Sequence, residues 1–225
     1  MLDYVLRTAV NDESLGFKVA NSISRSRGKS KYICELAFAD DILLMSDCHL
    51  KAQTMLMSIE GVAKKVGLMI NVSKAEYILV GKLWESTEGF EIRLESGVLR
   101  KVNDFKYLGS WLLNCSKDFE VRRALAWNAC IRLVKIWKSN SVSREVKLNL
   151  FRACVESVLL YNAVTWTMTS TLERRIDGCY TRLLRYALGF KWDDYISNEK
   201  LYGKLQSVSS RLLEKQLIFA GHSAS

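Results

Sequence analysis

Two adjacent aspartates, Asp40 and Asp41, lie between two apolar segments of the chain. Tyr32–Ala37 precedes them and Ile42–Ser46 follows, and both segments have the composition of short β-strands. Two such strands around a polar pair predict a hairpin with both carboxylates at its tip, at the mouth of a packed core. Carboxylate oxygens in that position suit Mg²⁺. Aspartate is also a common turn residue, so the pair by itself leaves a metal site and an ordinary turn both open.

The first 110 residues alternate short β-like segments with helix, which indicates an α+β fold. A helix is expected over Leu50–Val66, with Gly67 ending it. A short basic segment, Ser24–Ser30, is expected to form an exposed loop. Further strands are predicted at Tyr77–Val80, Phe90–Leu94 and Leu99–Val102.

From residue 111 onward the pattern becomes helical. Ser116 is expected to cap a helix that runs to about Lys138, and Ser143 is expected to cap the next one. The residues that this second helix is expected to bury are Val146, Leu150, Cys154, Val158 and Tyr161.

A third helix, from Thr171 to about Leu188, separates its apolar and basic residues onto neighbouring faces. The apolar stripe is Leu172, Ile176, Cys179, Leu183 and Ala187, and the basic stripe is Arg174, Arg175, Arg182 and Arg185. The planar guanidinium donates two parallel hydrogen bonds to a phosphate, so the basic stripe predicts a contact with a nucleic-acid backbone.

The positive charge of the chain is concentrated in its second half. Residues 1–110 carry 15 Lys and Arg against 14 Asp and Glu, whereas residues 111–225 carry 18 against 10. A balance of +8 in the second half fits a surface that grips phosphates. The alternative explanation of this excess charge is that surface lysines keep the protein soluble.

Composition sets further bounds. The chain has 225 residues, 49% of them hydrophobic and 25% charged, as in a globular protein. No apolar run is long enough to span a bilayer, and no secretory signal is visible. The six cysteines form no Cys-x-x-Cys pair, so we expect reduced thiols, no structural zinc and an intracellular protein, cytoplasmic or nuclear.

Four segments resemble, in order, motifs of the reverse transcriptases of non-LTR, LINE-type retrotransposons. Leu36–Leu44 looks like the catalytic hairpin, and Leu2–Ala9 is similar to the helix before it. Gly67–Glu76 is similar to the next palm motif, and Phe105–Ser110 resembles the primer grip. The region from Leu159 to Arg185 looks like the helical thumb, so the resemblance covers nearly the whole chain.

The resemblance implies a partial polymerase palm in residues 1–110 and a thumb-like, basic region in residues 111–225. Asp40 and Asp41 would bind Mg²⁺ or Mn²⁺ for nucleotidyl transfer, with Lys74 near the triphosphate. Lys106, Tyr107 and Gly109 would hold the primer end. The partners would be an RNA template, a DNA primer and deoxynucleoside triphosphates.

The chain also departs from the family pattern. The strand with the first catalytic aspartate, and the fingers, should lie before Met1, so this is expected to be a C-terminal portion with little or no synthesis of its own. A non-catalytic nucleic-acid-binding remnant is the alternative. Phe38 stands where many relatives have tyrosine, and we expect it on a buried face.

Overall fold

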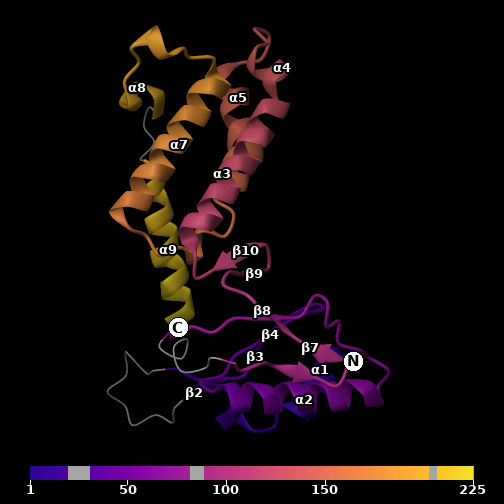
Figure 1. Ribbon diagram of the computed structural model, residues 1–225. Coiled ribbons are helices and arrows are strands. Elements are labelled where there is room, and N and C mark those ends of the chain that lie inside the picture. The colour runs from indigo at the N-terminus through magenta and orange to yellow at the C-terminus, as the bar shows by residue number, and fades with distance from the viewer. Residues whose placement is uncertain (20–30, 82–88, 203–206, 225) are drawn as a thin grey trace, which may run out of the picture. The chain divides into compact units, whose positions relative to one another are not determined.

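The computed structural model describes residues 1–19, 31–81, 89–202 and 207–224 (Figure 1). The chain divides into two compact units, Met1–Gly109 and Ser110–Ser225. The first mixes helices with short strands and the second is mainly helical, which confirms an α+β fold. The basic segment Ser24–Ser30, expected to be an exposed loop, lies outside the described residues.

The first unit contains two α-helices and nine short strands within the described residues. The helices are α1 (Leu2–Ala9) and α2 (His49–Lys65), and a 3₁₀ turn covers Glu13–Leu15. The strands are β1 (Phe17–Val19), β2 (Lys31–Ile33), β3 (Glu35–Phe38), β4 (Asp41–Leu44), β5 (Glu76–Tyr77), β6 (Arg93–Leu94), β7 (Gly97–Val98), β8 (Arg100–Lys101) and β9 (Phe105–Tyr107). The pairs β1–β2, β3–β4 and β6–β7 are antiparallel, and β5 pairs with β8 in parallel.

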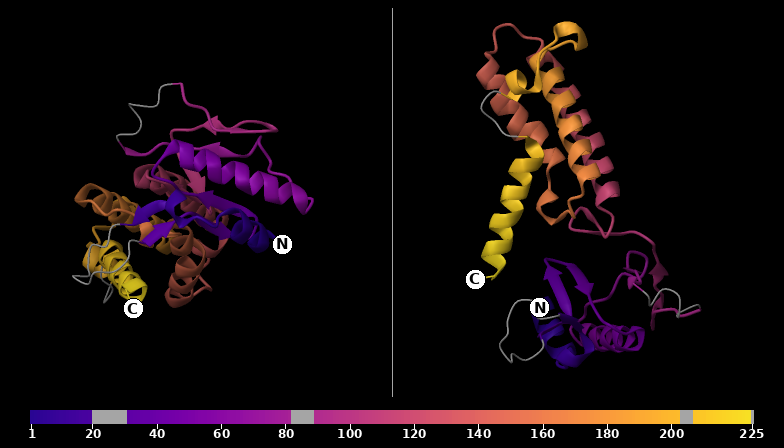
Figure 2. Two further views of the ribbon diagram at one scale, coloured as in Figure 1. Left: turned by 90° about the horizontal axis from the view of Figure 1, so that it is seen from below. Right: turned by 90° about the vertical axis from the view of Figure 1, so that its left-hand side faces the viewer.

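The β3–β4 hairpin is supported from beneath by helices. Val5 of α1 and Ile59 of α2 belong to one buried cluster, and Ile42 and Leu44 of β4 pack against it. Figure 1 and Figure 2 show α1 running beside α2. Because an isolated two-stranded hairpin is only marginally stable in water, this packing is what holds the hairpin in place.

The second unit begins with β10 (Ser110–Leu112) and continues as helices. These are α3 (Cys115–Arg132), α4 (Val134–Trp137), α5 (Arg144–Phe151), α6 (Ser157–Leu159), α7 (Ser170–Leu188), α8 (Asn198–Tyr202) and α9 (Val208–Ala224). A π-helical turn, Arg152–Glu156, joins α5 to α6, and 3₁₀ turns cover Ala163–Thr165 and Trp192–Asp194. Helices α3, α5 and α7 run side by side (Figure 1, Figure 2).

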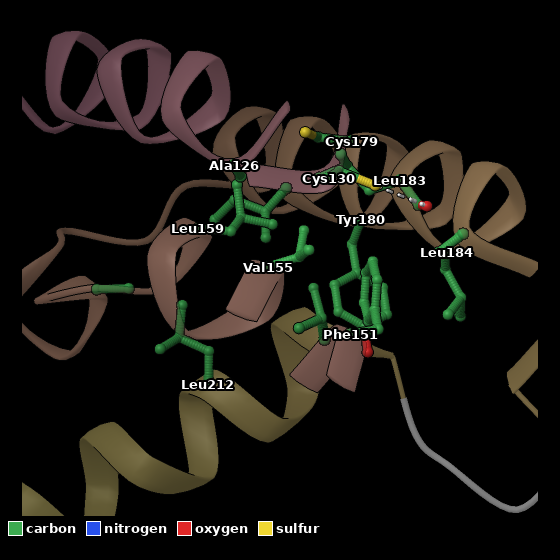
Figure 3. Packing of buried hydrophobic residues seen from close by; sticks show 14 of the residues in the cluster. Ala126, Cys130, Phe151, Val155, Leu159, Cys179, Tyr180, Leu183, Leu184 and Leu212 are labelled. Atoms are coloured by element: carbon green, nitrogen blue, oxygen red, sulfur yellow. Dashed lines mark hydrogen bonds between the residues drawn. The ribbon is translucent and has the colours of Figure 1, made fainter. Parts of the chain in front are cut away.

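The apolar stripe expected on α7 is buried along its whole length. Its side chains meet those of α3, α5 and α6 in one core (Figure 3). Gly189, at φ 76°, ends the helix in the left-handed conformation that glycine adopts readily. Thr169 caps the other end by accepting a hydrogen bond from the Leu172 amide at 3.2 Å.

One expected cap is correct and one is wrong. The Ser143 hydroxyl accepts from the Val146 amide at 3.3 Å and caps α5. Helix α3, however, is capped by Asn114, whose side chain accepts from the Lys117 amide at 3.0 Å. The helix therefore begins one residue before Ser116, because asparagine is at least as good a cap as serine.

The buried face expected for the α5–α6 segment is wrong in part, because Leu150, Cys154 and Val158 pack against the core but are only partly buried. Val146 and Tyr161 are 48% and 49% exposed, whereas Phe151, Val155 and Leu159 are fully buried. Residues four apart share one face of a helix, so Phe151, Val155 and Leu159 form a stripe that is displaced by one residue from the expected one.

The six cysteines are all unpaired thiols, and three of them, Cys34, Cys130 and Cys179, are buried. Burial raises the pKa of Cys130 to about 11, so this thiol stays protonated and unreactive at neutral pH. Within the described part of the chain, no three His, Cys, Asp or Glu side chains gather into a metal-binding group. No helix described here is long and apolar enough to cross a membrane.

Candidate catalytic hairpin and basic helix face

The two aspartates lie where the sequence predicted them, at the tip of the β3–β4 hairpin. Phe38 and Asp41 are the last paired residues, so Ala39 and Asp40 form a two-residue turn. Ala39 has a φ of 54°. In a two-residue hairpin turn, a positive φ at the first position alone is the sign pattern of a type II′ turn, which favours glycine there. An alanine in that conformation is strained, and such strain is concentrated at functional sites.

The two faces of the hairpin differ. Directly paired residues project to the same face, so Asp41 shares a face with Phe38, Leu36 and Leu43. Phe38 is 63% exposed and Leu36 is 45% exposed. The expectation that Phe38 is buried is therefore wrong. Because side chains alternate along a strand, Ile42 and Leu44 lie on the opposite face and pack against the core.

Both carboxylates are exposed, and neither has a hydrogen-bond or ion-pair partner in the part of the chain that the structure describes. Proteins commonly bind Mg²⁺ through one or two carboxylates, with water and substrate phosphates as the other ligands. Asp40 and Asp41 fit that partial ligand set. They do not form a metal cage of their own, because no third ligating side chain joins them among the described residues.

Lys74 lies in an exposed turn immediately before β5. The amides of Lys74 and Ala75 both donate to the Asn71 carbonyl, at 3.1 and 3.0 Å. Ala75 packs against the same buried cluster as Leu44 of the hairpin. The turn and the hairpin thus share a core, although no hydrogen bond or ion pair joins Lys74 to either aspartate in the described structure.

Tyr107 links two of the segments that sequence analysis singled out. Its hydroxyl, at the end of β9, donates to the carbonyl of Leu36 in β3 at 3.2 Å, across 71 residues of sequence. Tyr107 is half-buried, and the neighbouring Lys106 is exposed. The following Leu108 and Gly109 both have positive φ, 48° and 82°, and Gly109 suits that conformation. The tyrosine therefore fixes β9 to the β3–β4 hairpin.

The four arginines of α7 divide into two pairs. The Arg174 and Arg182 side chains are exposed, and each Nε donates to a carbonyl of its own helix at 3.1 Å. Their terminal nitrogens have no partner among the described residues. By contrast, Arg175 pairs with Glu120 of α3, and Arg185 donates to the Ile196 carbonyl. Two arginines thus remain open to a ligand and two make tertiary contacts.

Arg123 is a basic residue of this surface that sequence analysis missed. It pairs with one carboxylate oxygen of Glu120 while Arg175 pairs with the other. Burial raises the pKa of Cys179, and the positive charges of Arg182 and Arg123 oppose that rise. The basic surface therefore extends from α7 onto α3. Glu120 and Arg123 are three residues apart on one helix, but the sequence does not show that Arg175 joins them, because that pair depends on how α3 and α7 pack.

The chain is similar to a Caenorhabditis elegans protein described as uncharacterized and transposon-derived. The two are 24% identical over 207 residues, which cover 88% of this chain and 74% of that protein. No protein-family model matches the chain, and no solved structure gives a significant match. The description of the relative points to a transposon and names no activity.

Proposed function

We propose that this chain is the palm and thumb portion of an RNA-directed DNA polymerase from a non-LTR, LINE-type retrotransposon. The observation that carries the proposal is the hydrogen bond from Tyr107 to Leu36. It joins the segment that resembles a primer grip to the segment that resembles a catalytic hairpin. The similarity to a transposon-derived protein supports the same origin.

In this proposal Asp40 and Asp41 would hold Mg²⁺ or Mn²⁺. The bound cations would stabilise the attacking and leaving oxygens of nucleotidyl transfer. The packing of Ile42 on α1 and α2 would keep both carboxylates in a fixed position. The open face of the hairpin, with Phe38, would receive the primer end, and the ammonium group of Lys74 would neutralise the leaving pyrophosphate.

The first test of the proposal is Asp40→Asn. In the presence of template, primer and a deoxynucleoside triphosphate, we expect this change to weaken Mn²⁺ binding by about tenfold or more, the scale known for defects around a metal site. Any primer extension should be lost, whereas nucleic-acid affinity should be unchanged or higher because a negative charge is removed. Water-proton relaxation measures the bound Mn²⁺, and fluorescence anisotropy measures nucleic-acid affinity.

Asp47→Asn is the matched control, because Asp47 is an exposed aspartate of the same unit that pairs with Lys51 at 3.0 Å. It should leave Mn²⁺ binding unchanged. If Asp40→Asn also leaves it unchanged while nucleic acid still binds, the chain is a non-catalytic binding remnant and the catalytic part of the proposal is wrong.

The second test concerns the two open arginines of α7. Replacing Arg174 and Arg182 together with glutamine should weaken binding of all single-stranded sequences alike. Each phosphate contact contributes about 0.7 to the slope of log affinity against log salt, so losing two should make this slope shallower by about 1.4. Anisotropy titrations over a salt series measure it. Arg175 and Arg185 are left intact because they make tertiary contacts.

Arg132→Gln with Lys138→Gln removes the same charge from exposed positions elsewhere in the unit. This control pair should leave the slope nearly unchanged. Equal slopes for the two double variants would mean that the α7 face is not a phosphate-binding surface.

A further inference from the structure

Two partly exposed aromatic rings of the second unit each have a cation against one face. The Lys117 ammonium lies 3.7 Å from the centroid of the Trp111 ring. The guanidinium carbon of Arg122 lies 4.2 Å from the centroid of the Tyr161 ring. Trp111 is half-buried and Tyr161 is 49% exposed, so neither ring is enclosed in the core.

A buried carboxylate holds these two aromatic–cation pairs together. Asp118 is only 1% exposed. Its carboxylate accepts from the Trp111 amide at 3.4 Å and from the Trp166 indole N–H at 2.8 Å. The Nε of Arg122 lies 3.9 Å from the same carboxylate. Both pairs therefore depend on one fixed anion.

The backbone segments that carry the two rings also lie side by side. The Asn162 amide group donates to the Ser110 hydroxyl at 3.0 Å, across 52 residues of sequence. Trp111 follows one of these residues and Tyr161 precedes the other, so the two rings flank one hydrogen-bonded contact between distant parts of the sequence. Asn162 has a φ of 58°, in the left-handed region that asparagine adopts more readily than most residues, and this hydrogen bond helps to hold it there.

We propose that Trp111 and Tyr161 form a stacking platform for the unpaired bases of single-stranded nucleic acid. An exposed aromatic face accepts any base, because every base has a π-face, and the partly exposed ammonium of Lys117 favours the phosphates between bases. The excess of positive charge in residues 111–225 also favours a polyanion. The platform uses other residues than the β3–β4 hairpin and the arginines of α7. It rests on one part of the proposed function, namely that the chain binds nucleic acid.

The test compares two labelled strands that carry the same number of phosphates, an oligothymidylate and a fully abasic strand. The full-length chain should bind the base-bearing strand at least about tenfold more tightly, because stacking contributes that much per base. Trp111→Leu with Tyr161→Leu should remove this preference. Its affinity for the abasic strand and its salt dependence should match those of the unmodified chain.

Two further variants separate stacking from a structural role. Trp111→Phe with Tyr161→Phe keeps both rings and should retain most of the preference. Tyr186→Leu removes another exposed tyrosine, whose ring meets Trp127 edge-on at 5.9 Å, and should leave the preference unchanged.

Equal affinity of the unmodified chain for the two strands would overturn the platform, and so would an equal loss on both strands in the double leucine variant. A failure of the phosphate-binding surface on α7 would give a different result. The double variant of Arg174 and Arg182 would then have the same salt slope as the unmodified chain, while the unmodified chain would still prefer the base-bearing strand. If the unmodified chain binds neither strand, the platform and the nucleic-acid part of the proposed function are both wrong.

Discussion

Arg211→Met is expected to destabilise the second unit by about 3 kcal/mol. Glu156 is only 9% exposed, and it accepts hydrogen bonds from the Arg211 guanidinium at 3.0 Å and from the Tyr180 hydroxyl at 2.8 Å. Without the guanidinium, the buried Glu156 carboxylate would have only one hydrogen-bond donor left, the neutral Tyr180 hydroxyl. Because 23% of the Arg211 side chain is exposed, water can reach part of the site, and the loss should fall at the lower end of the range for buried pairs.

The neighbouring Tyr180 hydroxyl is the second donor to the Glu156 carboxylate. Burial raises the pKa of Tyr180, and the adjacent Glu156 charge raises it further. The hydroxyl therefore stays protonated and continues to donate throughout the neutral pH range. The Arg211 guanidinium also lies over the Tyr180 ring, 5.4 Å from its centroid, so the methionine variant loses this contact too.

Urea unfolding followed by circular dichroism measures the change. Arg132→Met, at an exposed position, should shift the free energy of unfolding by no more than about 0.5 kcal/mol. Adding Glu156→Gln to Arg211→Met should recover part of the loss, because the unpaired charge is then gone. If Arg211→Met and Arg132→Met have the same effect, the ion pair does not stabilise the unit.

Sequence periodicity located the long helices better than the short strands. Helix α7 occupies Ser170–Leu188, and the sequence predicted Thr171 to about Leu188. The agreement is good because the apolar residues recur at helical spacing over the whole length of this 19-residue helix. The strand expected at Tyr77–Val80 is only Glu76–Tyr77, and it pairs in parallel with Arg100–Lys101. A two-residue strand has too few side chains for a pattern, so its position depends on the partner strand.

The same limit applies to the candidate site. The hairpin tip was predictable, since Asp40 and Asp41 are flanked by apolar residues on both sides. The bond between Tyr107 and Leu36 was not, because it joins residues far apart in the sequence. Helical angles grouped Arg174 with Arg175 but could not reveal that Glu120 of another helix pairs with the latter. Local patterns predict which residues share a face, and tertiary packing decides which of them stay open to a ligand.

The segment from α5 to α6 buries a different face from the one that periodicity predicts, and two substitutions test which face is buried. Leu159→Ala should destabilise the second unit by about 2–5 kcal/mol, because it would leave a cavity in the core. Leu159 is 0% exposed and packs with Phe151 and Val155. Val146→Ala, at a position that periodicity placed in the core, should cost less than about 1 kcal/mol because Val146 is 48% exposed.

The reason is that two neighbouring stripes of the segment have the same spacing. Val146, Leu150, Cys154 and Val158 are four residues apart, as the sequence predicts, and so are Phe151, Val155 and Leu159, one residue further along. The structure buries the second stripe more deeply, and spacing alone does not distinguish the two. Urea unfolding of the two alanine variants measures the difference. Equal losses, or a larger loss for Val146→Ala, would mean that the buried face in solution is the one periodicity predicts.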